Sequence, residues 1–161
     1  MTSPPAATHR DAFAELVRPH WSVMSTLANR LAPDNDGDDA LQEALAAAWR
    51  KRAQFDPSRG TARNWLLAIV ADQARKGYRR LRPALELLDE AGEETRPEVD
   101  VDLRSALARL TDRQRPAITL HYYLGLPVAD IADVMSCSAG TVKSTLSDAR
   151  ARLRRELGED Y

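Results

Sequence analysis

The chain has 161 residues and a formal net charge of -1, so nothing in its overall charge indicates a nucleic-acid partner, and any such contact requires local segregation of charge. A charged fraction of 29% and a hydrophobic fraction of 43% are typical of a globular protein, with room for one compact domain or two small ones. The single cysteine, Cys137, excludes an intramolecular disulfide and, with no Cys/His cluster, a structural zinc site.

The N-terminal part of the chain predicts helices after a short tail. Residues 1–10 are rich in proline and alanine and are expected to fray. Apolar residues then recur at helical spacing from Asp11 to Leu31, with a bend expected near Pro19. A polar turn follows, in which Asp36 or Asp38 is suited to cap the next helix.

The helix predicted over 37–55 has two contrasting faces. Its buried stripe is expected to consist of Leu41, Leu45, Ala48 and Trp49. An acidic and amide patch falls on the opposite face by the same spacing rule, and it comprises Asp39, Gln42, Glu43, Ala46 and Arg50. The patch fits either a solvated surface or a docking face for a basic partner helix, and spacing alone leaves both open.

The next predicted helix, TARNWLLAIVADQARKGYRRLRP, changes from apolar to basic along its length. Its apolar face contains Trp65, Leu66, Ile69 and Val70. Its second half gathers five cations and one aromatic ring: Arg75, Lys76, Tyr78, Arg79, Arg80 and Arg82. Cations suit phosphates and the ring suits an unstacked base, which together favour contact with a nucleic-acid strand. Simple capping of the negative helix end by the cations is the alternative.

Residues 83–101 differ sharply in composition from both flanking segments. They are strongly acidic, contain two prolines and a glycine, and include a single cation, Arg96. This composition predicts a flexible acidic linker between a domain at 11–82 and a second domain at 102–161. Such a linker is commonly only a solvated segment, although between two basic surfaces it could also mimic nucleic acid. The sequence therefore predicts an all-α protein of two small helical domains.

The second domain is expected to begin with a short helix that contains Leu103, Ala106, Leu107 and Leu110. Thr111 is suited to cap the following helix, with Pro116 in the first turn, where proline is tolerated. An apolar set is then expected to cover the helix-turn-helix, and it consists of Ile118, Leu120, Tyr122 and Leu124.

A helix-turn-helix is predicted between Pro127 and Leu157. Val128, Ile131, Ala132 and Met135 form the apolar face of its first helix, and Ser138 is suited to cap the second helix. The second helix buries Val142, Leu146, Ala149 and Leu153. Its remaining surface is polar and basic, as in a recognition helix that enters the major groove. The expected DNA contacts are Thr141, Lys143, Ser144, Ser147, Arg150 and Arg152. A helical hairpin with a solvated charged face is the alternative.

These motifs, in this order, resemble the sigma factors of bacterial RNA polymerase, specifically the small extracytoplasmic-function (ECF) type of the sigma-70 superfamily. GDDALQEALAAAW resembles region 2.2 through Asp38, Asp39, Gln42, Glu43 and Trp49. RNWLLAIVADQARKGYRR resembles regions 2.3 and 2.4, and the stretch from Leu110 to Leu153 resembles region 4.2. The resemblance extends over about residues 11–157.

The resemblance implies a role for each segment. Asp38, Asp39, Gln42 and Glu43 would dock on the clamp helices of the polymerase beta-prime subunit. Region 4 would read the duplex -35 element of promoter DNA and touch the beta flap, and the linker would run toward the active centre and the RNA exit path. The residues that would melt the -10 element and hold its bases are Arg63, Trp65, Asp72, Arg75, Lys76, Tyr78, Arg79 and Arg80.

Three positions depart from the family pattern. Asp72 stands where the family usually has asparagine, close to the expected -10 pocket. Asp148 replaces what is often a cation in the recognition helix, and Ser136 stands where glycine often makes the turn. These departures argue against adopting the promoter consensus of another family member.

A regulator of the LuxR type is the competing interpretation, because LTDRQR and IADVMSCSAGTVKS also fit its output domain, although residues 11–82 show no receiver-like pattern. No enzyme is expected, since His9, His20 and His121 are scattered and no phosphate-binding glycine loop occurs. His20 and His121 are interpreted as partly buried structural residues. No metal or cofactor is expected.

The cellular location and regulation are predicted from what the sequence lacks. No apolar run approaches the ~20 residues of a membrane span, and the N-terminus has no signal-peptide core. We therefore expect a cytoplasmic protein without membrane insertion. The chain has no extension beyond Tyr161 that could inhibit it internally, so we expect regulation in trans by an anti-sigma protein.

Overall fold

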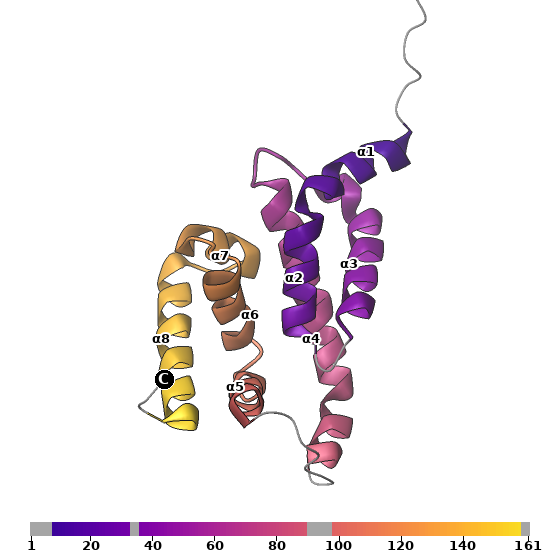
Figure 1. The fold of residues 1–161 in the computed structure, drawn as a ribbon. Helices are drawn as coiled ribbons and strands as arrows, with labels where there is room; N and C mark the ends of the chain where they lie inside the picture. The colour runs from indigo at the N-terminus through magenta and orange to yellow at the C-terminus, as the bar shows by residue number, and fades with distance from the viewer. Residues whose placement is uncertain (1–7, 33–35, 90–97, 159–161) are drawn as a thin grey trace, which may run out of the picture.

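The structure is a computed structural model that describes residues 8–32, 36–89 and 98–158, without the side chains of 81–89 and 98–102. The described chain is helical and contains no strand, which confirms the predicted all-α class. Figure 1 shows two helical groups side by side. The N-terminal domain runs from α1 (His9–Val17) to α4 (Ala62–Asp89), and the C-terminal domain runs from α5 (Glu98–Ala108) to α8 (Ala139–Leu157).

Proline interrupts the first predicted helix, as expected. α1 is followed by a 3-10 turn, η1 (Arg18–His20), and then by α2 (Trp21–Leu31). Pro19 lies in the turn because its ring and missing N–H do not suit a helix interior. α1 begins at His9, inside the segment expected to fray, because Thr8 and Asp11 form a capping box.

The core of the N-terminal domain lies between α2, α3 (Gly37–Lys51) and α4. Small residues on the inner face of α3 let the helices approach closely, and Ala44, Ala47 and Ala48 are all buried there. Gly37 is required for the same reason, since a Cβ at this position would lie only 1.9 Å from Oδ1 of Asn29. The largest fully buried side chains between these helices are Met24, Leu27, Leu66, Leu67 and Val70.

The face of α3 that was predicted to be buried does face the core. Leu41 and Ala48 are buried, whereas Leu45 and Trp49 are half-buried against the core. Asp36 occupies the N-cap position as predicted, although its side chain makes no capping hydrogen bond. A short 3-10 turn, η2 (Arg52–Gln54), ends this helical stretch.

Helix α4 continues into the segment that composition predicts as a linker. It runs through Pro83 to Asp89, and α5 begins at Glu98. Proline favours a helix end, but the residues that follow it, ALELLD, are mostly strong helix formers. The middle of the expected linker, residues 90–97, lies outside the described residues.

The C-terminal domain contains α6 (Gln114–Ile118), the π-helical segment η3 (Thr119–Tyr123), and α7 (Val128–Met135) before α8. α6 begins later than expected, with Arg113 at its N-cap position. Thr111 still stabilises the entry, because the hydroxyl of Thr111 accepts the N–H of Gln114 at 3.1 Å and the Gln114 side chain accepts the N–H of Thr111 at 3.1 Å.

Tyr122 is not a buried member of the apolar set that was predicted to cover the helix-turn-helix. Its side chain is 56% exposed, whereas Ile118 and Leu120 are buried as expected. The N–H of Leu124 bonds the carbonyl of Thr119 at 3.2 Å, a π-helical bond that changes which residues face inward. Leu126 beyond the turn is buried, a core position that the spacing did not indicate.

The predicted helix-turn-helix is confirmed. Val142, Leu146 and Ala149 of α8 are buried, as is Ile131 of α7. The hydroxyl of Ser138 caps α8 by accepting the N–H of Thr141 at 3.1 Å. The turn between the two helices passes through Ser136, which has a left-handed backbone conformation with φ 52.

The left-handed conformation of Ser136 leads to a stability prediction. A side chain with a Cβ is disfavoured there, and a β-branched one most of all. We expect Ser136→Val to lower the free energy of unfolding by about 1–2 kcal/mol. Ser136→Gly is expected to preserve or raise it, because glycine adopts this conformation without steric cost. Denaturant unfolding measures both, with Ser22→Val at an exposed position of α2 as the control; equal loss in all three variants would contradict the prediction.

Candidate polymerase and promoter contacts

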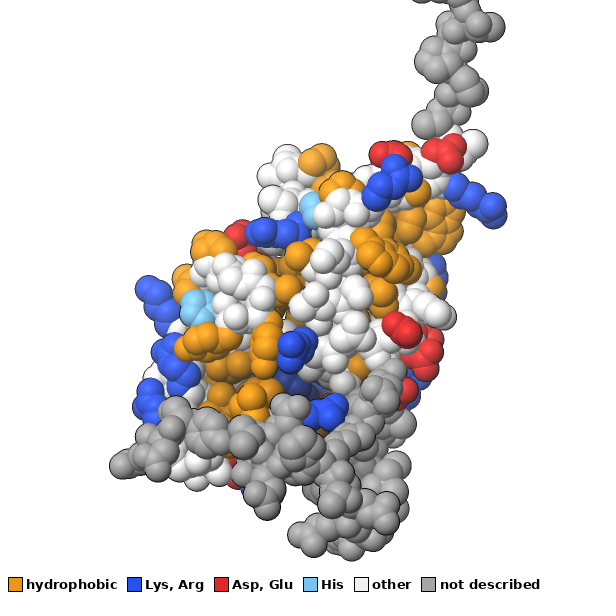
Figure 2. Space-filling model, viewed as in Figure 1, with side chains coloured by type: hydrophobic (Ala, Val, Ile, Leu, Met, Phe, Trp, Pro, Cys, Tyr) orange, Lys and Arg blue, Asp and Glu red, His pale blue; other side chains and the backbone are white. Residues whose placement is uncertain are grey.

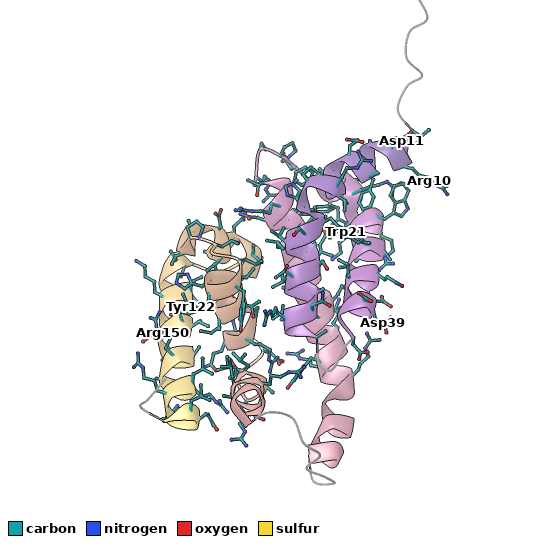
Figure 3. The ribbon with its side chains drawn as sticks, in the orientation of Figure 1. Arg10, Asp11, Trp21, Asp39, Tyr122 and Arg150 are labelled. Carbon is teal, nitrogen blue, oxygen red and sulfur yellow. The ribbon has the colours of Figure 1, made fainter. Side chains whose placement is uncertain are left out.

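The polar face of α3 is exposed as the sequence predicts. Asp38, Asp39, Gln42 and Glu43 all lie on the solvent side of the helix. In Figure 3 Asp39 points away from the body of the domain, and Figure 2 shows acidic side chains gathered over α3. Two of the acids are in the first turn, where negative charge complements the positive helix end. The acids therefore have a local electrostatic role and also remain available to a partner.

The polar start of α8 is held in a fixed shape by short-range hydrogen bonds. The hydroxyls of Ser138 and Thr141 lie 2.9 Å apart, and the hydroxyl of Ser144 donates to the Thr141 carbonyl at 3.0 Å. Lys143 and Ser147 project into solvent. Thr141 is half-buried, so among the predicted DNA contacts it is better suited to shaping the helix start than to reaching a base.

Farther along α8, Arg150 is held by a tyrosine from another element. Its Nη1 donates to the Tyr122 hydroxyl at 3.2 Å, and both side chains lie on the outer side of the domain in Figure 3. The Tyr122 ring meets His121 edge-on at 4.8 Å between centroids. Arg152 is half-buried. Cations line the outer edge of α8 in Figure 2, which gives this helix a basic outer surface.

The residues predicted for the -10 element lie along α4 but do not share one environment. Trp65 is half-buried, and its ring lies 5.2 Å from that of Phe55. Asp72 accepts from Arg75 at 2.8 Å and pairs with Lys76 at 2.9 Å. Partial burial acts to raise the pKa of Asp72, but bonds from Lys76 and Arg75 outweigh it and hold that pKa below its ordinary value. The Asp72 side chain is therefore ionised and neutralised by its own helix.

Three of the predicted -10 residues make polar contacts with the C-terminal domain. Arg63 pairs with Asp130 of α7 at 3.1 Å. The Tyr78 hydroxyl donates to the carbonyl of Ala108 at 3.1 Å. Arg79 pairs with Asp112 at 3.0 Å. Of the remaining cations, Arg75, Lys76 and Arg80 are exposed.

Asn64 is a functional candidate that sequence reasoning missed. It is only 4% exposed, and its side-chain nitrogen donates to Asp130 at 3.0 Å and to Asp133 at 3.0 Å. Its own N–H is accepted by the Thr61 hydroxyl at 3.1 Å, which caps α4. A polar residue next to the apolar run that begins at Trp65 is the only sequence signal that could have indicated it.

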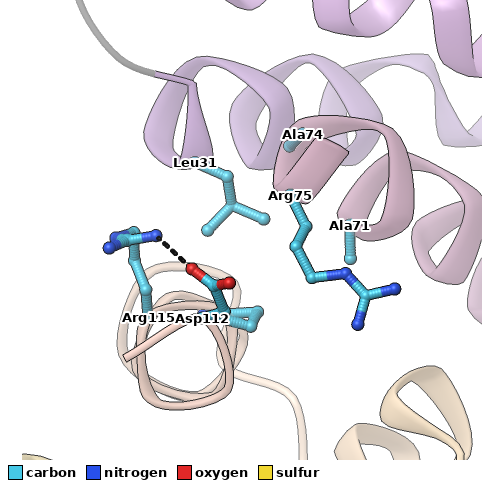
Figure 4. Close-up of a pocket in the computed structure, with 7 residues that line it drawn as sticks. Leu31, Ala71, Ala74, Arg75, Asp112 and Arg115 are labelled. Carbon is cyan, nitrogen blue, oxygen red and sulfur yellow. Dashed lines mark ion pairs between the residues drawn. The ribbon is translucent and has the colours of Figure 1, made fainter. Parts of the chain in front are cut away.

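Arg115 is a second missed residue, and it is 8% exposed. Its guanidinium donates to the carbonyls of Leu107, Ala108 and Leu110 and lies 4.0 Å from the centre of the Tyr78 ring. Figure 4 shows its ion pair with Asp112 beside a small cavity between α2, α4 and α6. The cavity holds about 10 Å³, room for one water at most.

The histidines do not converge on a site. His20 and His121 are half-buried and His9 is exposed. Burial, with the positive charge of Arg63 adding to it, lowers the pKa of His20. In the part of the chain that the structure describes, no group of three or more His, Cys, Asp or Glu side chains could hold a metal ion.

Comparison with known families gives matches in both domains. Sigma-70 region 2 matches residues 16–83, and Sigma-70, region 4 matches residues 100–153. The ECF RNA polymerase sigma factor SigM of Mycobacterium tuberculosis is 33% identical over 158 residues, which cover 94% of this chain and 80% of that protein. SigK of Mycolicibacterium vanbaalenii is 31% identical over 134 residues, which cover 75% of this chain and 68% of that protein.

Two solved structures have the same arrangement of helices. The sigma factor RpoE in complex with the anti-sigma factor NepR, from Bartonella quintana, has a TM-score of 0.69 and 26% identity over 93% of this chain and 99% of that chain. CnrH, in complex with the cytosolic domain of CnrY, has a TM-score of 0.69 and 29% identity over 95% of this chain and 92% of that chain.

The matches extend over the N-terminal domain as well as the helix-turn-helix, so the LuxR-type interpretation is not favoured. Proteins of the matched family act as non-enzymatic factors of transcription initiation. None of the described helices combines the length and the hydropathy that crossing a bilayer requires. The order of region 2 and region 4, together with the identity to SigM over most of both chains, shows that this chain belongs to the ECF sigma factors of RNA polymerase.

Proposed function

We propose that the two domains divide promoter recognition between them, with residues 11–82 acting on core polymerase and the -10 element and residues 102–161 acting on the -35 element. The observation that supports this division most is the exposed polar face of α3, which is separate from the basic surfaces of α4 and α8. Asp38, Asp39, Gln42 and Glu43 dock on the beta-prime clamp helices, because an acidic and amide face complements a basic helix. The beta flap receives the C-terminal domain.

The -10 element is bound along α4. The proposed contacts combine cations for phosphates with aromatic rings for unstacked bases. They are Arg63, Trp65, Asp72, Arg75, Lys76, Tyr78, Arg79 and Arg80. Arg75, Lys76, Arg79 and Arg80 are exposed members of this set. Arg63, Tyr78 and Arg79 must exchange partners in the C-terminal domain for DNA.

The -35 element is bound by α8 in the major groove. Lys143, Ser144 and Ser147 are proposed to face the bases, because side chains near the start of a recognition helix reach base edges. Thr141 shapes the helix start, and Arg150 and Arg152 hold the phosphate backbone.

Replacement of Lys143 tests whether base recognition and phosphate contact are made by different residues of α8. Lys143→Ala is expected to weaken promoter binding by about 1–3 kcal/mol and to relax the base preference at one upstream position. Arg152→Ala or Arg155→Ala should weaken all sequences alike and lower the slope of log K against log salt by about one. Binding to a set of mutated -35 elements at several salt concentrations measures this. Identical behaviour of the three variants would contradict this division between base recognition and phosphate contact.

The link between the domains makes promoter binding dependent on core polymerase. Tethering makes the second DNA contact intramolecular, but an acidic tether avoids DNA. Free protein should therefore bind promoters poorly, and core enzyme should supply basic channels for the segment 83–101 and fix the distance between the domains. The protein is proposed to act in the cytoplasm, where its polymerase is, and to be held inactive by an anti-sigma protein in trans; the two solved relatives in complexes of this kind support that partner.

Transcription from a library of promoter sequences tests the proposal directly. Core polymerase alone and core with this protein transcribe the same library, and the enriched sequences are read. We expect the protein to select a subset with two conserved elements separated by a spacer. Co-migration with core on a sizing column is the companion measurement. A protein that neither co-migrates with core nor changes the selected promoters is not acting as proposed.

A further inference from the structure

The two domains are held together by polar contacts that use the proposed -10 surface. Asp130 receives Arg63 at 3.1 Å and Asn64 at 3.0 Å, and Asp133 receives Asn64 at 3.0 Å. These residues are 66 to 69 positions apart in the chain. We call Arg63, Asn64, Asp130 and Asp133 the upper contact.

A lower contact joins the same two domains near the basic end of α4. Arg79 pairs with Asp112 at 3.0 Å, and Arg115 lies 4.0 Å over the ring of Tyr78. Between the two contacts, Arg30 of α2 lies 4.0 Å over the ring of Tyr123 of η3. In the upper and lower contacts, a carboxylate of the C-terminal domain meets a cation of the N-terminal domain.

We propose that these contacts form an intramolecular latch in which Asp130, Asp133 and Asp112 take the place of DNA phosphates and hold the free protein in a closed, inactive arrangement. This inference rests on the proposed function of Arg63, Tyr78 and Arg79. A carboxylate and a phosphate are both anionic acceptors for a guanidinium, so the two compete for the same arginine. In the closed protein the polar groups of these three side chains are bonded to the C-terminal domain, so each must leave its partner before it binds the -10 strand.

The burial of Asn64 strengthens the latch. The Arg63 and Asp130 side chains are 37% and 30% exposed, so their ion pair is screened by water and salt. Asn64 is 4% exposed, and its side chain has acceptors in Asp130 and Asp133. Opening the domains exchanges these well-placed carboxylate acceptors for water.

The size of the closed form gives an independent reason for opening. Promoter elements about 25 base pairs apart are separated by about 85 Å of B-DNA. A compact chain of 161 residues has a radius of gyration of only about 15 Å. Two domains that touch through α4 and α7 therefore do not reach both elements. Binding to core must break the latch, and the closed population lowers the apparent affinity for core.

The first test locks the latch covalently. A Cβ on Gly60 would lie 3.8 Å from Cγ of Asp133, and in Asp133→Cys the sulfur takes about the place of that Cγ, so the two side chains meet across the domains. Gly60→Cys and Asp133→Cys are combined in a Cys137→Ser background, and the protein is treated with diamide. We expect an intramolecular crosslink in high yield, at least a tenfold loss of promoter-specific transcription with core, and recovery in dithiothreitol. Failure of the crosslink to form, or equal transcription by the locked and reduced forms, would overturn the proposal.

The second test opens the latch. Asp130→Ala removes the carboxylate shared by Arg63 and Asn64, and we expect about tenfold tighter binding to core and a larger radius of gyration in solution scattering. Glu156→Ala is the matched control, because it removes a C-terminal-domain carboxylate whose partner, Arg109, is in the same domain. Equal effects of the two variants, or no change in either, would contradict the latch.

The two tests separate this inference from the proposed function. If the wild-type protein itself fails to bind core and to transcribe, the proposed function fails, and the latch is then judged by the crosslink yield and the scattering of Asp130→Ala alone. If the wild-type protein transcribes and the locked form does so equally well, only the latch fails.

Discussion

Alanine at both Tyr78 and Arg79 is expected to abolish promoter opening on linear DNA while sparing the first, closed encounter with the promoter. Loss of a base-stacking ring costs about 1–3 kcal/mol, and loss of a phosphate contact adds to it, so the combined effect reaches about a hundredfold or more. Reactivity of unpaired thymines to permanganate, with core polymerase present, measures the opening. On a pre-melted template most of the function should return, since strand separation is already supplied.

The hydroxyl of Tyr78 allows a sharper control for this prediction. It donates to the carbonyl of Ala108 across the domains, so Tyr78→Phe removes that bond and keeps the stacking ring. We therefore expect Tyr78→Phe to open linear promoters at least as well as the wild type. Arg10→Ala, at an exposed cation on α1, should also leave opening unchanged. Because α4 runs on to Asp89, these residues do not cap its C-terminal end. An equal defect of the double alanine variant on both templates would show that Tyr78 and Arg79 do not act in DNA melting.

Reversal of charge at Asp39 and Glu43 is expected to weaken binding to core polymerase by several kcal/mol, which is more than a hundredfold in affinity. Both side chains are exposed on α3, so lysine at these positions faces a basic clamp helix and repels it. The first-turn position of Asp39 adds a small helix penalty of about 0.3–1 kcal/mol, which circular dichroism should register as a modest loss of stability and not as unfolding.

A fluorescence titration of the protein with core polymerase, in the absence of DNA, measures the affinity of this docking face. Reversal of Glu15 and Asp56, two exposed acids elsewhere in the N-terminal domain, provides a control with the same change in net charge. We expect the control protein to bind core within about threefold of the wild type, because exposed charges away from an interface act weakly through salt. Equal weakening by both reversals would attribute the effect to net charge and not to this face.

The sequence by itself determined the local faces of the helices. The buried register Val142, Leu146 and Ala149 in α8 and the exposed set Asp39, Gln42 and Glu43 in α3 both follow from helical spacing. The break at Pro19 and the cap at Ser138 follow from the chemistry of single residues. Each of these features depends on residues a few positions apart, so the pattern along the chain contains the information.

Only the tertiary structure decided which partners the exposed polar side chains have. The resemblance assigned Arg63, Tyr78 and Arg79 to the -10 contacts, whereas the folded chain pairs Arg63 with Asp130 and Arg79 with Asp112. The π-helical bond at Leu124 turned Tyr122 outward, and α4 continued past Pro83. Helical periodicity indicates which face of an element is apolar, but a contact between residues more than thirty positions apart depends on how whole domains pack.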